Sequence, residues 1–139
     1  MIDRVLVPMD DSEMAKRALR YALETHPEAE ITVLHVVGEP SAMMGEAVGL
    51  ALEEDIEAAG EEHAKAVFDS ARALAAETDA EIDTAVAYGS PAKAIVNRAE
   101  DFDAVIIGTH GGSLVDRLVV GNVAETVFRR SPVPVTVVR

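Results

Sequence analysis

The sequence predicts an α/β fold with a single open, five-stranded parallel sheet in the Rossmann-like order 3-2-1-4-5 and helices on both faces. Five short apolar runs alternate with four segments of helical periodicity, which is typical of a parallel sheet built from strand–helix units. The chain has 139 residues, 49% of them hydrophobic, so residues 1–139 are expected to form one domain with its own core. Because crossovers between parallel strands are right-handed, helices cover both faces only if the strand order reverses within the sheet.

The first half of the chain predicts two strands separated by a helix. Residues 2–8 form the first strand, since their apolar, β-branched run is closed by a proline. The next helix has Asp11 or Ser12 as its N-cap and ends near the first His-Pro pair, because alanines and leucines recur at helical spacing before it. Residues 31–37 form the second strand.

A long segment rich in alanine and glutamate then predicts a helix over residues 47–77. Gly49 and Gly60 are two places where a helix of this length would break or loosen. The remaining elements follow in the same alternation: a strand at 81–88, a helix from the Ser90-Pro91 cap to about 101, a strand at 103–107, a helix at 123–130 and a strand at 133–138.

The charge of the chain excludes several classes of partner. Twelve lysines and arginines stand against 25 aspartates and glutamates, a net charge of −13, which repels nucleic acid and anionic membranes. The absence of cysteine excludes disulfides and thiol chemistry. The first ten residues resemble neither a signal peptide nor a membrane span, so we expect a cytoplasmic protein. Only three cations are lysines, which fits either a high-salt cytoplasm or an ordinary acidic protein.

Two unusual strand exits predict where a ligand binds. Pro8-Met9-Asp10 follows the first strand, and a glycine-rich segment follows the fourth. Ligands of open parallel sheets bind outside the carboxyl ends of the strands, at the point where the strand order reverses. If the first and fourth strands are neighbours, both exits face one crevice.

The segment after the fourth strand has the composition of a phosphate site. It contains Gly108-Thr109-His110-Gly111, nine further residues, and Gly121-Asn122-Val123. Glycine lets a ligand approach the backbone, and the free N–H groups at a helix start bind phosphate. It is not a Walker A loop, because no Gly-Lys-Ser/Thr follows. The alternative is a ligand-free loop in which Asn122 and Glu125 form a variant of the capping box.

Five motifs together resemble the universal stress protein family from end to end. They are VLVPMD at 5–10, LHVV at 34–37, IIGTHG at 106–111, VVGNVAETV at 119–127 and SPVPVTVV at 131–138. The nucleotide-binding branch of that family carries G-x2-G-x9-G followed by Ser or Thr, and less often Asn. This chain has the same spacing, with Asn122 at the last position.

The resemblance implies a homodimeric regulatory protein that binds ATP or another adenine nucleotide. It implies that Asp10 lies by the ribose and phosphates, that the backbone of Val36 meets the adenine edge, and that the three glycines and Asn122 hold the phosphates with Mg²⁺ or Mn²⁺. It also implies dimerisation through the last strand, Val133–Val138, which would otherwise be an exposed apolar edge. With their chain neighbours, the predicted nucleotide-binding residues are Pro8, Met9, Asp10, Val36, Gly108, Thr109, His110, Gly111, Gly121, Asn122 and Val123.

Several residues and the function itself keep a second interpretation. Asp10 is either a ligand residue or a second cap for the first helix, His110 either contacts phosphate or is a polar loop residue, and His35 is predicted to be a hydrogen-bonded core histidine.

No catalytic set is evident, so we expect at most slow ATP hydrolysis. The main alternative is a dimeric interaction module of the same fold that binds no nucleotide. A phospho-receiver domain lacks its required aspartate and lysine here, and a phosphohydrolase using Asp10 lacks an acid two residues on.

Overall fold

The computed structural model describes residues 2–38, 46–109 and 121–139. Its elements in chain order are β1 (Arg4–Pro8), α1 (Glu13–Thr25), β2 (Glu30–Val37), α2 (Glu46–Ala76), β3 (Asp83–Tyr88), α3 (Pro91–Ala99), β4 (Ala104–Gly108), α4 (Asn122–Arg130) and β5 (Val135–Val138). The five strands form one parallel sheet in the order β3-β2-β1-β4-β5, which confirms the predicted topology.

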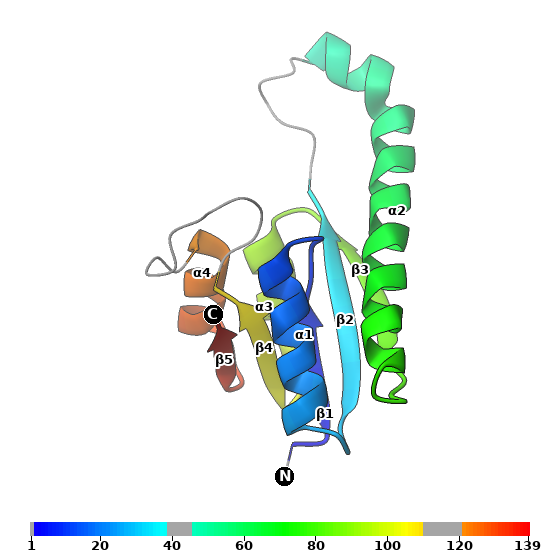
Figure 1. Cartoon of the computed structure of the whole chain (residues 1–139). Coiled ribbons are helices and arrows are strands. Elements are labelled where there is room, and N and C mark those ends of the chain that lie inside the picture. Colours follow the sequence, from blue (N-terminus) through cyan, green and yellow to red (C-terminus); the bar gives the residue numbers. More distant parts are fainter. Residues whose placement is uncertain (1, 39–45, 110–120) are drawn as a thin grey trace.

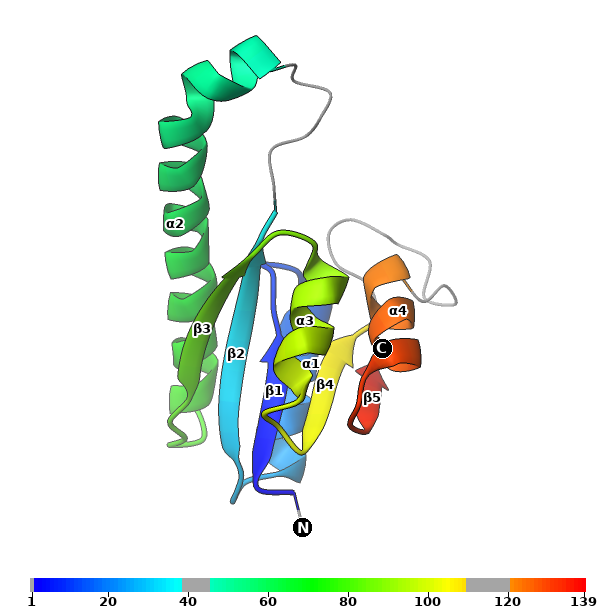
Figure 2. The same cartoon turned by 180° about the vertical axis from the view of Figure 1, so that it is seen from behind.

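The helices cover the two faces of the sheet in pairs. Figure 1 shows α1 and α2 on one face, and Figure 2 shows α3 and α4 on the other. Alternate strand residues enter the two cores, because successive side chains of a strand point to opposite faces. The first core holds Val5, Val7, Ile31, Val33 and Ile106 under α1 and α2, and the second holds Leu6, Leu34, Val105 and Ile107 under α3 and α4. The strand order reverses between β1 and β4, as predicted.

Helix α1 begins where the sequence pattern predicts, and Ser12 is its N-cap. The Ser12 hydroxyl accepts a hydrogen bond from the N–H of Ala15 at 3.2 Å, which satisfies one of the free donors of the first turn. The buried face of α1 includes Ala18 and Leu19, both fully buried against the sheet. Burial of a leucine of this kind contributes about 1.5–3 kcal/mol.

Helix α2 is unbroken from Glu46 to Ala76, so neither glycine within it ends the helix. Gly60 lies against the end of β2 instead: a Cβ atom at this position would stand 2.8 Å from Cγ1 of Val37. The small residue therefore permits close packing of α2 on the sheet. Within the residues that the structure describes, no helix has the length and the apolar character that crossing a membrane requires.

Most other bounds differ from the predictions by one or two residues. Strand β5 starts at Val135 rather than at 133, because Pro134 has no N–H to donate, although its carbonyl accepts the N–H of Val105 at 2.9 Å. Ser90 occupies the N-cap position of α3, but its side chain makes no capping hydrogen bond. Proline at N1 and the sheet contacts of α3 are enough to start that helix.

Hydrogen bonds to Asp103 link the start of β1 to the loop before β4. Its Oδ2 accepts the N–H groups of Asp3 at 2.9 Å and Arg4 at 3.0 Å. These backbone hydrogen bonds favour the charged carboxylate and hold the pKa of Asp103 below its ordinary value of 3.8.

The lowered pKa predicts a pH-dependent contribution of Asp103 to stability. Because the folded pKa lies below the unfolded one, the stabilisation is present above pH 3.8 and is lost as the pH falls through the folded value. Asp103→Asn, which resembles the protonated acid, is expected to unfold at lower urea concentration than wild type at pH 7. The two proteins should converge as the pH falls below 3.8, and a difference that stays constant with pH would contradict this assignment.

Candidate functional site

A cavity lies outside the carboxyl ends of β1 and β4, where the strand order reverses. Its volume is about 370 Å³. This is the place at which open parallel sheets bind ligands, because the two neighbouring connections leave toward opposite faces. The described residues that line it are Pro8, Met9, Asp10, Ser12, Ala15, Leu34, His35, Val36, Pro91, Ile95, Ile107, Gly108, Gly121, Asn122, Val123 and Ala124.

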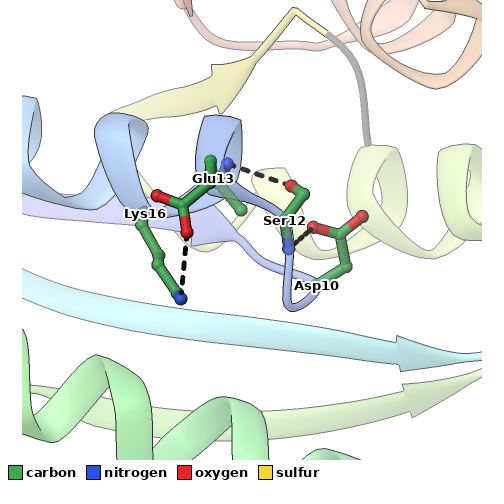
Figure 3. Close-up of polar contacts among 5 residues, drawn as sticks. Asp10, Ser12, Glu13 and Lys16 are labelled. Carbon is green, nitrogen blue, oxygen red and sulfur yellow. Dashed lines mark hydrogen bonds and ion pairs between the residues drawn. The ribbon is translucent and has the colours of Figure 1, made fainter. Parts of the chain in front are cut away.

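The exit of β1 is held by a chain of hydrogen bonds. The Met9 N–H donates to the Leu34 carbonyl at 2.8 Å, and the Met9 carbonyl accepts from Nδ1 of His35 at 2.9 Å. The next residue, Asp10, accepts the N–H of Ser12 through Oδ1 at 2.9 Å (Figure 3). Asp10 therefore supports the N-cap without being the cap itself, and it is one of the residues that line the cavity. His35 is 6% exposed, which confirms the predicted core histidine.

The exit of β4 depends on Gly108 for a reason that the sequence pattern did not predict. A Cβ atom on Gly108 would stand 2.9 Å from the carbonyl oxygen of Met14 and 3.1 Å from its Cβ. The glycine thus permits β4 to pass close under the first turn of α1. The packing of a helix on a strand requires this glycine, whether or not a ligand approaches it.

Thr109 joins β4, β5 and α4 through its backbone. Its N–H donates to the carbonyl of Val138 at 2.8 Å, and its carbonyl accepts the N–H of Gly121 at 2.6 Å. Its hydroxyl is buried and has no hydrogen-bond partner among the described residues. Thr109 therefore sets the start of α4, although it does not line the cavity.

The first turn of α4 lines the cavity and carries backbone donors that have no acceptor among the described residues. Gly121 is the N-cap, with φ −65° and ψ 157°, and the first intrahelical hydrogen bond is donated by Glu125 to the Gly121 carbonyl. The N–H groups of residues 122–124 thus have no intrahelical acceptor. Asn122 is the first helical residue and Gly121 holds the N-cap position, so Asn122 and Glu125 do not form a capping box and that alternative is wrong. Glu125 pairs with Arg129 at 2.8 Å instead.

The backbone edge of Val36 also faces the cavity. The Leu34 carbonyl points toward β1, where it accepts the Met9 N–H, whereas the Val37 carbonyl points toward β3, where it accepts the N–H of Gly89. Alternate residues of a strand direct their N–H and C=O groups to the same edge, so those of Val36 point toward β1. Because β1 ends at Pro8, opposite Leu34, Val36 reaches past its end.

Eight predicted site residues line this one cavity: Pro8, Met9, Asp10, Val36, Gly108, Gly121, Asn122 and Val123. Thr109 adjoins it, and His110 and Gly111 lie outside the described residues. The sequence patterns missed Pro91 and Ile95 of α3. The Ser90-Pro91 cap offered a signal, since every helix of a parallel sheet begins near the carboxyl edge of the strands. Among the described residues, no group of three or more potential metal ligands comes together.

Comparisons with known proteins agree with this architecture. The universal stress protein family model matches residues 1–139. Universal stress protein YxiE of Bacillus subtilis (strain 168) is 28% identical over 148 residues, which cover 100% of both chains. The structure of universal stress protein UspA from Lactobacillus plantarum is 28% identical, with a TM-score of 0.85 over 99% of this chain and 98% of that one. A universal stress protein in complex with cAMP shares the fold at 24% identity, with a TM-score of 0.71 over 99% and 97% of the two chains. The chain belongs to the universal stress protein family.

Proposed function

We propose that this chain binds an adenine nucleotide, ATP or a relative of it, in the crevice between β1 and β4 and acts as a regulatory protein. One observation supports this most directly. A single cavity joins two kinds of backbone donor, the edge of Val36 and the N–H groups of the first turn of α4, which have no acceptor among the described residues. The first kind suits phosphate, because a helix start carries a partial positive charge. The second suits the edge of a purine, which offers both a donor and an acceptor.

The cavity has the size and lining of a small-molecule site. Its volume of about 370 Å³ lies within the usual range for ligand pockets. Its walls are mostly apolar, with Leu34, Ile95 and Ile107 from the second core, and the polar residues that line it include Asp10 and Asn122. This lining suits a ligand with one flat apolar part and one anionic part. A protein of the same fold is solved in complex with cAMP, which has both.

The residues present fit Mg²⁺ or Mn²⁺ only as a companion of the phosphates. Asp10 is the one carboxylate among the described residues that line the cavity. Mg²⁺ is commonly held by one or two carboxylates together with substrate phosphates and water. We therefore propose that Asp10 and the phosphates together hold the metal ion. The positive charge of the ion then offsets the repulsion between the Asp10 carboxylate and the phosphates.

The same lining supports binding rather than fast hydrolysis. Cleavage of ATP needs an oriented water and a positive group that stabilises the transferred phosphoryl group. Among the described residues, no lysine or arginine lines the cavity. We propose that hydrolysis is slow or absent and that occupancy of the site is the signal.

The test is to denature the purified protein and identify any released nucleotide by mass spectrometry. Adenine nucleotide released in near-equimolar amount supports the proposal. If the protein is empty, ATP with Mg²⁺ is added at a hundredfold excess over the dissociation constant, where stabilisation of about 2.7 kcal/mol is expected. An empty protein whose melting temperature does not respond to ATP, ADP, AMP or cyclic AMP is instead the non-binding interaction module.

We also propose that two copies pair through β5, an edge strand of the sheet. The carbonyls of Pro134 and Val138 point inward, since they accept hydrogen bonds from β4 and its exit. By alternation, the backbone groups of Val135 and Val137 point outward, free to meet an identical strand. The side chain of Phe128 on α4 is 64% exposed, and α4 packs against β5, so it offers apolar surface near that edge.

Val137→Pro is expected to convert a wild-type dimer into a monomer at micromolar concentration. The substitution removes an outward N–H and leaves the inward hydrogen bonds to β4 in place. Val137→Ala is the matched control, because it also shortens the side chain but keeps the N–H, and it should remain dimeric. Sedimentation velocity measures the result. A monomeric wild type, or dimers in all three proteins, would count against pairing through this edge.

A further inference from the structure

His35 has a hydrogen bond that the packing of the core does not require. It lies on β2, on the face covered by α1 and α2, and its ring is buried. Nδ1 lies 2.9 Å from the Met9 carbonyl oxygen. Because a carbonyl can only accept, Nδ1 must donate, so the ring carries a proton on Nδ1.

This bond replaces the next step of the β1–β2 ladder. The Met9 N–H donates to the Leu34 carbonyl, as in a regular parallel pair one residue past the end of β1. In a regular ladder the Met9 carbonyl would then accept the N–H of Val36. Among the hydrogen bonds of the described residues, that carbonyl is bound by the His35 ring instead. The ladder therefore stops before Val36, at the wall of the cavity.

We propose that His35 is a positioning residue for the nucleotide. By holding the Met9 carbonyl, its ring leaves the Val36 N–H to the purine and fixes the peptide from which Asp10 projects. Without this donor, the Met9 carbonyl would be left buried and unpaired. It could regain a partner by turning to the Val36 N–H, which would then be lost to the ligand. This inference rests on the proposed function, because it assigns a role within the same site.

The ring of His63 helps to hold His35 in place. It reaches over from α2 and meets His35 edge to face, with the ring centroids 5.2 Å apart. The side chain of His63 is exposed, so it supports the ring of His35 without lining the cavity. His63→Phe keeps an aromatic ring beside His35 and serves as a control that leaves the donor on Nδ1 untouched.

The experiment compares two amides at position 35 by titration with AMP and with ATP. His35→Asn places an amide N–H where Nδ1 stood and can still donate to Met9. His35→Gln places its amide where Nε2 stood and cannot. We expect the Asn variant to bind within about threefold of wild type and the Gln variant to lose at least tenfold, by the same factor for AMP and ATP. His63→Phe should bind like wild type.

Melting temperatures separate positioning from stability. Both amides remove the same ring from the core, and in the Gln variant the Met9 carbonyl regains a partner at the Val36 N–H, so the two melting temperatures should fall together while the affinities differ. Equal affinities of the Asn and Gln variants, or a loss confined to ATP, would overturn the role of His35 and leave the proposed function standing. A wild-type protein that binds neither nucleotide would end the proposed function and this inference with it.

Discussion

Gly108→Ala is expected to destabilise the protein by about 1–3 kcal/mol, although the change adds a single methyl group. The new Cβ would stand 2.9 Å from the backbone oxygen of Met14, and backbone cannot rotate away as a side chain can. Relief requires α1 to shift from β4, and α1 carries much of the first core. The measurement is the free energy of unfolding from urea titration.

Two other glycines serve as controls for this prediction. A Cβ on Gly38 would meet no atom of the described residues within 4 Å, so Gly38→Ala should change the free energy of unfolding by less than about 0.5 kcal/mol. A Cβ on Gly60 would meet a Val37 methyl group at 2.8 Å, which can turn aside, while alanine gains about 0.5–1 kcal/mol of helix propensity. Gly60→Ala should therefore fall between the other two. If Gly108→Ala is as mild as Gly38→Ala, close packing on Met14 does not explain this glycine.

Asn122→Asp is expected to stabilise the fold slightly and to weaken nucleotide binding strongly. Asn122 is the first residue of α4, where a carboxylate interacts favourably with the helix dipole by about 0.3–1 kcal/mol. The same charge would face the phosphates at the helix start, and a loss of about 1.5–3 kcal/mol, roughly ten- to a hundredfold in affinity, follows from the repulsion. The loss should be larger for ATP than for AMP, because ATP carries more charge.

The Asn122→Asp variant is informative because its expected effects on stability and on nucleotide affinity have opposite signs. A general disturbance of α4 would lower both the melting temperature and the affinity, whereas a local charge raises one and lowers the other. Asn122→Ser is the matched control: it keeps a neutral polar group at the same place and should bind within about threefold of wild type. Calorimetric titration with ATP and AMP measures the effect. Equal ATP affinities of the Asp and Ser variants would mean that the phosphates do not lie at the start of α4.

The fold was predictable because its signals are local. Apolar runs of strand length, separated by segments of helical period, indicate a parallel sheet without knowledge of any contact. Ser12 as N-cap of α1 follows from the residue type and the pattern after it. The ends of the strands were harder to predict, since a strand ends where its neighbouring strand stops pairing with it. The start of β5 at Val135 depends on how Pro134 meets Val105 in β4.

The sequence predicted which residues form the candidate site, but not the structural role of each residue. The glycine pattern predicted backbone approach by a ligand at Gly108, yet a Cβ at this position would meet Met14 of another element. Asn122 and Glu125 have the spacing of a capping box, but Gly121 is the cap and Glu125 pairs with Arg129. Spacing along a chain identifies candidates for such roles, and three-dimensional neighbours choose among them.

The sequence by itself determined the order of the elements along the chain and the two strand exits, because periodicity, proline and glycine act within a few residues. Only the tertiary structure decided which groups face the crevice. The direction of the Val36 backbone depends on where β1 ends beside it, and the partner of the Met9 carbonyl is a ring 26 residues away. Such choices depend on hydrogen bonds between distant segments, and these exist only once the sheet has formed.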